Sequence, residues 1–246
     1  MPDLSSPAAP IIVTDLSNQE FLERYARPGC IGLSGGVTLV DKAICRAQRH
    51  LDERERWGVW SHAFLFQGRR VDGHHWVIES DLQIEPKHIR LGVQENRITK
   101  YFNEKNYTAL AVLDFGLTEA QTKAVIVEGL ELVAQRTRYS VRELFGTLFA
   151  LQHPKLRGEE NVMARDHSVY CSALVQQLFR KAGVDLAPGV AGKNTTPEDL
   201  SRTSVPHTMY LLQRAVARSS IKSLGRKIGQ RVKARVKLLK RKSNNA

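Results

Sequence analysis

The sequence predicts an α+β fold in which an antiparallel sheet packs against an amphipathic helix. Residues 62–67 and 75–80 are short apolar runs, and the loop between them, residues 68–73, begins and ends with glycine, which is typical of a β-hairpin. Residues 118–135 and 169–182 carry apolar side chains three and four positions apart, which is typical of helices that cover a core. The composition, 42% apolar and 25% charged, is ordinary for a soluble globular protein.

The remaining elements follow from local patterns on both sides of the hairpin. Before it, the sequence predicts a strand and a short helix over residues 11–24, a short strand over 30–33 and a helix over 40–51. After it, the sequence predicts a strand over 107–113 and a largely buried helix over 141–151.

Cap residues mark where several helices begin and end. Thr118 and Thr196 fit N-caps, because each has a polar residue three positions later. Gly183 follows two basic residues and can end the helix over 169–182. The buried face predicted for the helix over 118–135 consists of Ala124, Val127, Leu130, Val133 and Ala134.

The cysteine content indicates the compartment. Cys30, Cys45 and Cys171 form an odd and sparse set, which argues against a disulfide framework and for a reducing environment. Their spacing is not that of a zinc site, so we expect no metal and no cofactor. The N-terminus has no basic and apolar leader, and no run of about 18 apolar residues occurs, so we expect a cytoplasmic protein.

The positive charge is concentrated at the C-terminus. Lys and Arg number 37 against 25 acidic residues, and the segment after Gln213 holds 12 of these basic residues and no acid. The first 213 residues are therefore neutral overall. This division predicts three parts: an N-terminal extension over 1–27, a domain over 28–213 and a basic tail over 214–246.

Within the tail, residues 214–242 have the pattern of a cationic amphipathic helix. The apolar positions recur every three or four residues and are Ile221, Leu224, Ile228, Val232, Val236 and Leu239. An apolar stripe suits an anionic membrane surface better than nucleic acid, which needs charge alone. The tail also lacks aromatic residues that could stack on bases. A solvated helix, or one docked on a partner, is the remaining alternative.

Cys171 is the first candidate functional residue. If Ser168 is the N-cap, Cys171 lies in the first turn of its helix, where the helix dipole stabilises a thiolate and lowers its pKa. Apolar residues three, four and seven positions later would bury the same face of the helix. The alternative is a buried structural cysteine, and we interpret Cys30 and Cys45 in that way.

His62 and Glu79 are candidate partners for this thiol. His62 begins an apolar strand, and Glu79 interrupts the next one, where a buried carboxylate should be paired. A thiol, a histidine and a carboxylate are the parts of a nucleophile with its base and orienting group. The alternatives are a hydrogen-bonded core histidine and an outward-facing glutamate. A six-residue loop over 68–73 would set His62 opposite Glu79, whereas a tight turn at its end would shift the pairing by four residues.

Four short motifs resemble those of circularly permuted papain-like cysteine hydrolases, the YiiX-like branch of the NlpC-type superfamily. They are SHAFL at 61–65, VIES at 77–80, VYCSALV at 169–175 and TPEDL at 196–200. The order His, Glu, Cys is the reverse of papain's order, and the resemblance covers roughly residues 28–205. It implies a papain-like core in which an antiparallel sheet packs on the nucleophile helix, in a circularly permuted chain.

The chain departs from that family pattern in two places. Such families usually have Gly-Asp where this chain has Pro-Gly-Cys at 28–30, and the hairpin is longer than in lecithin:retinol acyltransferase-like relatives. Those relatives use a second histidine as the third polar group. His74 or His75 could imitate it, but both fall near the hairpin loop, so Glu79 fits better.

The resemblance implies covalent acyl transfer without a cofactor. His62 would deprotonate Cys171, Glu79 would hold the imidazole, and the backbone N–H of Cys171 would bind the oxyanion. Tyr170 and Ser172 are further oxyanion or substrate candidates. The expected activity is hydrolysis of amide bonds in peptide-like substrates. A lipid-directed thioesterase or acyltransferase is one alternative, and a non-enzymatic membrane- or nucleic-acid-binding module with a structural cysteine is another.

Overall fold

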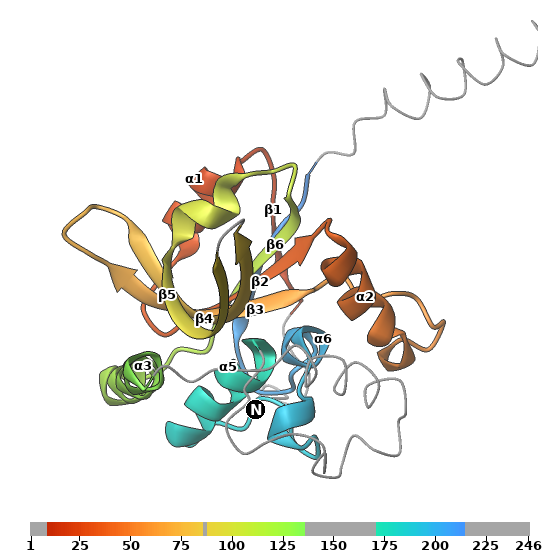
Figure 1. The fold of residues 1–246 in the computed structure, drawn as a ribbon. Coiled ribbons are helices and arrows are strands. Elements are labelled where there is room, and N and C mark those ends of the chain that lie inside the picture. The colour runs from red at the N-terminus through yellow and green to blue at the C-terminus, as the bar shows by residue number, and fades with distance from the viewer. Residues whose placement is uncertain (1–8, 86–87, 136–170, 215–246) are drawn as a thin grey trace, which may run out of the picture. The chain divides into compact units, whose positions relative to one another are not determined.

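The computed structural model describes residues 9–85, 88–135 and 171–214 (Figure 1). The contacts divide the chain into two compact units, Met1–Gln213 and Arg214–Ala246. The helices and strands of the first unit are β1 (Ile11–Val13), α1 (Asn18–Tyr25), β2 (Ile31–Gly36), α2 (Leu39–Ala47), β3 (His62–Arg69), β4 (His75–Glu85), β5 (His88–Arg97), β6 (Tyr107–Asp114), α3 (Glu119–Ala134), α5 (Cys171–Lys181), α6 (Pro197–Ser201) and β7 (Thr208–Leu212). Short 3₁₀ turns are η1 (Arg49–Leu51), η2 (Ile98–Phe102) and η4 (Gly192–Asn194).

The fold is a mixed α+β arrangement around one seven-stranded sheet. The strand order is β1-β7-β6-β2-β3-β4-β5. Neighbouring strands run antiparallel except β1 and β7, which are parallel. The α+β prediction is confirmed. Two strands that the sequence did not indicate, β5 and β7, extend the sheet on either side.

Both faces of the sheet are buried. Successive side chains of β3 alternate between the faces: Ala63 and Leu65 pack in the core beneath α3 and α5, whereas Phe64 and Phe66 pack with α1 and η2. Figure 1 shows α3 and α5 on one side of the sheet and α1 on the other. This two-sided burial explains why β3 reads as a continuous apolar run.

The cap predictions hold where the structure describes the helix ends. Thr118 and Thr196 each accept a hydrogen bond from the backbone N–H three residues later, and both form capping boxes. Gly183 follows α5 with a φ of +79°, a left-handed conformation that favours glycine. The Ser168 cap and the helix predicted over 141–151 lie outside the described residues.

The predicted buried face of α3 is only partly right: Leu130 and Val133 pack against the core, but Val127 does not. Val127 is 43% exposed, whereas Val125 and Gly129 are buried. A Cβ atom on Gly129 would lie 2.8 Å from a methyl carbon of Ile78, so the missing side chain lets α3 approach the sheet on that face. Apolar residues surround most of this helix, and periodicity alone therefore could not choose the face.

The register of the central hairpin matches neither predicted alternative. Phe64 lies opposite Glu79, and the pairing shifts by one residue between Phe66 and Gly68 before Arg69 meets His75. Gly68 has a φ of +128°, which an L side chain rarely adopts, so glycine permits this β-bulge. His62 and Glu79 are consequently diagonal neighbours on one face of the sheet.

The described part of residues 1–27, predicted as an extension, belongs to the same sheet and core. β1 pairs with β7, and Phe21 and Leu22 of α1 are fully buried. The helix predicted over 40–51 ends at Ala47, and a 3₁₀ turn follows. Among the described residues, no helix has both the length and the apolar character needed to cross a membrane.

Candidate active site

Cys171 is the first residue of α5, and His62 is the first residue of β3. Cys171 is partly exposed. Leu174, Val175 and Leu178, on the same helix, are fully buried against the sheet. The apolar stripe of α5 therefore fixes the helix on β3 and β4, and its first residue stays at the end of the core.

The thiol of Cys171 and the ring of His62 interact directly. Burial raises the pKa of Cys171. The charge and hydrogen bond of His62, together with the backbone N–H groups of Ala63 and Ser172, lower this pKa by more than burial raises it, so the net shift is downward. Burial likewise lowers the pKa of His62, but Cys171 and Glu79 raise it to about 10. Both shifts move the proton from sulfur to imidazole, which favours a thiolate–imidazolium pair.

Glu79 holds the other side of the His62 ring. Its Oε2 atom lies 2.5 Å from Nε2 of His62, and the carboxylate is fully buried. Because Nε2 is engaged with Glu79, Nδ1 remains to face the sulfur. The structure thus brings Cys171, His62 and Glu79 into one chain of contacts. His75 pairs with Arg69 near the hairpin turn, away from His62.

Three residues that the sequence did not indicate surround Glu79. Asn96 donates to its Oε1 at 2.7 Å, Lys100 donates to the same oxygen at 2.9 Å, and the Tyr101 hydroxyl donates to Oε2. Burial raises the pKa of Glu79, yet Lys100 and His62 lower it well below the usual value. The buried carboxylate therefore stays ionised and can hold an imidazolium.

Lys100 is itself balanced by a second acid. Its Nζ atom lies 2.5 Å from Asp81, two residues after Glu79 on the same face of β4. Burial lowers the pKa of Lys100, but Glu79 and Asp81 raise it above the usual value. Carboxylates therefore flank the ammonium group, and it remains charged beside the His62–Glu79 contact.

Aromatic packing positions Tyr101. Its ring stacks on Phe64 with centroids 4.2 Å apart, and both rings are fully buried. Phe64 lies over Gly32 of β2, where an added Cβ would meet the ring at 2.1 Å. Gly32 thus makes room for the stack that brings the Tyr101 hydroxyl to Glu79. The sequence signal for Tyr101 was weak, because a buried carboxylate indicates that partners exist but not which residues they are.

The side chain of Ser172, a further candidate, stands apart from this chain of contacts. The Ser172 hydroxyl is buried and donates to the carbonyl of Thr195 at 2.7 Å, so only its backbone N–H faces the sulfur. Tyr170 lies outside the described residues. Ser34 pairs directly with His62 across β2 and β3, and its buried hydroxyl has no hydrogen-bond partner in the described part of the chain.

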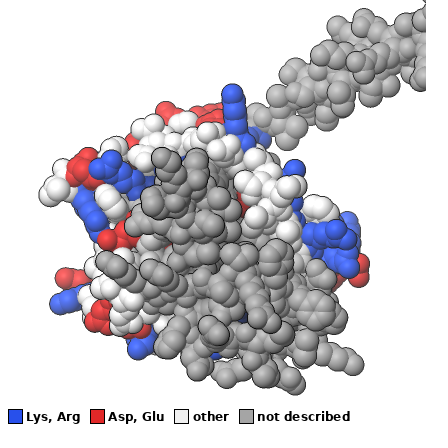
Figure 2. Space-filling view, viewed as in Figure 1, with Lys and Arg blue, Asp and Glu red and all other residues white. Residues whose placement is uncertain are grey.

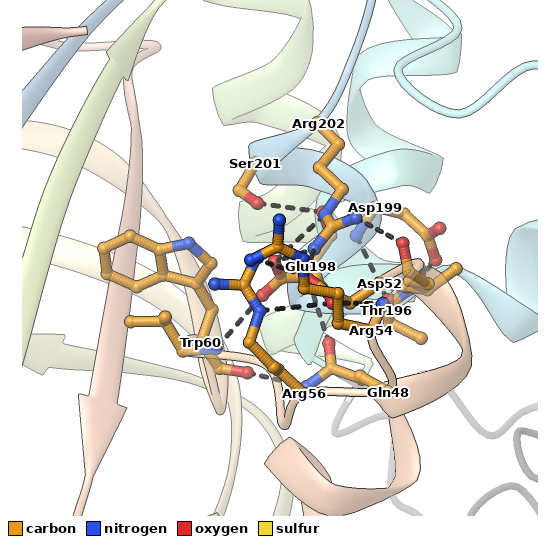
Figure 3. A network of polar contacts seen from close by, with 12 residues as sticks. Gln48, Asp52, Arg54, Arg56, Trp60, Thr196, Glu198, Asp199, Ser201 and Arg202 are labelled. Carbon is orange, nitrogen blue, oxygen red and sulfur yellow. Dashed lines mark hydrogen bonds and ion pairs between the residues drawn. The ribbon is translucent and has the colours of Figure 1, made fainter.

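A second polar network, shown in Figure 3, anchors the segment that leads into His62. The amide of Gln48 donates to the carbonyl of Trp60 at 2.8 Å and accepts from the backbone N–H of Glu198 at 2.8 Å. The Glu198 carboxylate accepts from Val59 and is paired with Arg202. α6 and α2 together therefore hold the backbone of residues 58–60 in place just before β3.

The fold resembles a solved structure. The crystal structure of YiiX from Escherichia coli O157:H7 superposes with a TM-score of 0.51 at 14% identity, covering 78% of this chain and 99% of that one. At this identity the likeness concerns the fold alone. Comparison with protein-family models and with curated proteins gives no match to the sequence.

YiiX has been described as a metalloprotein. In the described ranges of this chain, no group of three or more His, Cys, Asp or Glu side chains could hold a metal ion. Around Glu79, the carboxylates of Glu79 and Asp81 are both paired with the Lys100 ammonium group, and Glu79 also binds His62. The described residues therefore do not fit a metal site.

Proposed function

We propose that this protein is a cysteine-dependent acyl-transfer enzyme that hydrolyses amide bonds of peptide-like substrates through Cys171, His62 and Glu79. The observation that carries the proposal is the continuous contact from a thiol with a lowered pKa, through His62, to a fully buried carboxylate. A structural cysteine needs no such partner. Perturbed pKa values in a connected set are typical of catalytic groups.

The first half of the reaction forms an acyl-enzyme. The Cys171 thiolate attacks the substrate carbonyl carbon, a C–S bond forms, and negative charge collects on the carbonyl oxygen. The backbone N–H of Cys171, in the first turn of α5, stabilises that oxyanion. His62 then gives its proton to the leaving nitrogen as the C–N bond breaks, and the amine departs.

The second half returns the enzyme to its starting state. His62, now neutral, takes a proton from water, whose oxygen attacks the thioester carbon. The C–S bond breaks, the carboxylic acid leaves, and the thiolate is restored beside protonated His62. Throughout, Glu79 accepts the Nε2–H hydrogen bond and orients the ring without exchanging the proton.

A papain-like, circularly permuted arrangement is part of this proposal. It is supported by the chain order His62, Glu79, Cys171, by the packing of α5 on β3 and β4, and by the fold similarity to YiiX. A lipid-directed thioesterase or acyltransferase is the second candidate. It would use the same thiolate with another acceptor, and exposed apolar residues near the start of β3 favour it.

Trapping of the acyl-enzyme tests the proposal. The native protein is incubated with panels of activated amides, peptides and thioesters, quenched in acid and examined by peptide mass spectrometry. We expect an acyl group on Cys171 alone, which Cys171→Ala abolishes while circular dichroism stays unchanged. Equal and slow modification of all three cysteines by iodoacetamide at about pH 6 would instead identify Cys171 as structural.

A further inference from the structure

Exposed apolar side chains gather near the start of β3. Five of the nine large apolar side chains that are exposed in the described residues come from two short segments. These five residues form what we call the apolar patch: Val37, Leu39, Val40, Trp57 and Val59. Leu39 is 84% exposed and Trp57 is 55% exposed, and a group of exposed apolar residues, unlike a single one, marks an interaction surface.

The two segments of the patch adjoin each other and the candidate active site. The carbonyl oxygen of Val59 lies 2.5 Å from where a Cβ of Gly35 would be, and Gly58 donates to the carbonyl of Cys45 in α2 at 2.9 Å. β3 begins at His62, three residues after Val59. β2, whose Ser34 pairs with His62, leads into Val37.

The fold holds these side chains outward. The network in Figure 3 fixes the backbone on either side of Gly58, because Glu198 accepts from Val59 at 3.2 Å and Gln48 donates to Trp60. On the other segment, Thr38 caps α2 through a capping box with Asp41. Hydrogen bonds therefore hold the backbone of both segments in the conformation that exposes the patch.

Basic side chains continue the same surface along α2. Lys42, Arg46 and Arg49 are exposed and follow Leu39 at steps of three, four and three residues, which places the four on one face of the helix and the turn after it. Figure 2 shows Lys and Arg gathered beside an uncharged area on the side where α2 lies. Asp41 is engaged with Thr38 and Ser61, and Asp52 is paired with Arg56.

We propose that the apolar patch docks on an anionic lipid bilayer. Leu39 and Trp57 would enter the boundary between headgroups and acyl chains, and Lys42, Arg46 and Arg49 would meet the lipid phosphates. Tryptophan beside Lys and Arg is the composition that such an interface favours. Docking would present the start of β3, with His62, to the lipid surface. This proposal uses residues 37–59 only and does not depend on the proposed catalysis.

Trp57 makes the proposal directly measurable in the full-length protein. Tryptophan fluorescence is recorded with phosphatidylcholine–phosphatidylserine vesicles that carry a nitroxide on the acyl chain near the headgroup. Trp57→Phe keeps an aromatic side chain in the patch and removes the reporter, so subtraction isolates the Trp57 signal from Trp60 and Trp76. We expect strong nitroxide quenching of that difference signal and none with phosphatidylcholine alone.

A matched pair of charge variants completes the experiment. Leu39→Glu with Val40→Glu should weaken vesicle binding about tenfold or more, because the patch loses its apolar contact. Val71→Glu with Val127→Glu, at two exposed apolar positions outside the patch, should change binding less than about twofold. All positions are exposed, so the fold should tolerate the changes.

Three outcomes would overturn the proposal. Vesicle binding without quenching of Trp57 would assign it to the basic tail alone. Equal loss in both pairs of variants would show a general charge effect. Unchanged vesicle binding together with a shift of the protein from dimer to monomer in the patch variant, seen by sedimentation, would assign the patch to a second copy of the chain.

Discussion

Cys171 and Cys30 are thiols of one domain whose largest charged contributions have opposite signs. Burial raises the thiol pKa at both positions. Near Cys30 the second contribution is the carboxylate of Asp114, which raises the pKa further, to about 12. Near Cys171 it is the charge of His62, which reverses the effect of burial. Burial alone therefore makes a thiol inert, and a single buried cation restores its tendency to ionise.

Cys45 supports the same conclusion from a third environment. Burial raises its pKa to about 11, and the nearby acids Asp41 and Glu198 add to the effect. Two of the three thiols are thus held protonated by burial and carboxylates, whereas histidine lowers the pKa of the third. The three cysteines provide internal controls for one another, since a single labelling experiment reads all of them.

The largest expected effect comes from removing the cation. His62→Ala should make Cys171 resemble Cys30 more closely, because only the backbone N–H groups of Ala63 and Ser172 then oppose the effect of burial. We expect the rate of Cys171 alkylation at about pH 6 to fall at least about a hundredfold, with Cys30 and Cys45 unchanged. Peptide mass spectrometry after timed iodoacetamide exposure measures all three rates. A Cys171 rate that survives this substitution would mean that the helix dipole, not His62, activates the thiol.

A smaller effect is expected from Lys100, which acts through Glu79. Lys100→Met leaves two buried or half-buried carboxylates without their shared cation, so the free energy of unfolding should drop by about 2–4 kcal/mol. Cys171 alkylation should slow at low pH, because a Glu79 that protonates more readily holds His62 less firmly. Lys105→Met, at an exposed lysine in the following turn, is the control and should be neutral in both assays.

The ion pair should also leave a pH signature in stability. His62, raised from 6.5 to about 10, contributes stability that is full below pH 6.5 and is lost as the pH rises through 10. Cys171, lowered from 9.0, contributes stability that is full above pH 9.0 and is lost as the pH falls through its folded pKa. Between 6.5 and 9.0 the two changes cancel, because the folded and unfolded pairs each bind one proton.

The expected curve is therefore a plateau with a fall on each side. Above pH 9.0 the free energy of unfolding should decline by about 1.4 kcal/mol in total, with about half of the decline between pH 9.0 and 10. Cys171→Ala removes the largest contributions that raise the pKa of His62, so the variant should not show the fall in stability above pH 9.0. Urea titrations of both proteins across this range provide the measurement. Parallel curves for the two proteins would show that the thiol carries no charge.

The smallest effect on the thiols is expected from the basic tail. We propose that residues 214–242 bind anionic membranes, at about 1 kcal/mol for each basic residue near the surface. Replacing Lys240, Arg241 and Lys242 with Gln should weaken sedimentation with phosphatidylserine vesicles and reduce its salt dependence. The three alkylation rates should not change. Vesicle binding that the three substitutions leave unaltered would contradict the membrane assignment. So would a native protein that binds duplex DNA tightly and does not bind vesicles.

The sequence indicated those parts of the fold and site that rest on local signals. The capping residues and the apolar runs fixed α3, α5, β3 and β4 to within a few residues. The contact between His62 and Glu79 was predictable because a carboxylate inside an apolar strand requires a partner. The register was not predictable, since it depends on a one-residue bulge at Gly68 that no pattern marks.

The residues that surround Glu79 could not be predicted from the sequence for a related reason. Asn96 and Lys100 come from β5 and from the turn after it, and β5 has mixed polar and apolar residues without clear alternation. Their role arises only from pairing with β4, a long-range contact. The buried face of α3 could not be predicted fully, because apolar residues occur on most sides of this helix and no polar side orients it.

The absence of a side chain at Gly32 has a consequence for how this protein tolerates change. The Phe64 ring occupies the space a Cβ would need, and Tyr101 lies on that ring. Any larger residue at this position would displace the aromatic pair and, through it, the hydroxyl beside Glu79. In a saturation-mutagenesis map scored by Cys171 labelling, Gly32 should therefore be as intolerant as the charged residues. A search restricted to chemically reactive side chains would overlook it.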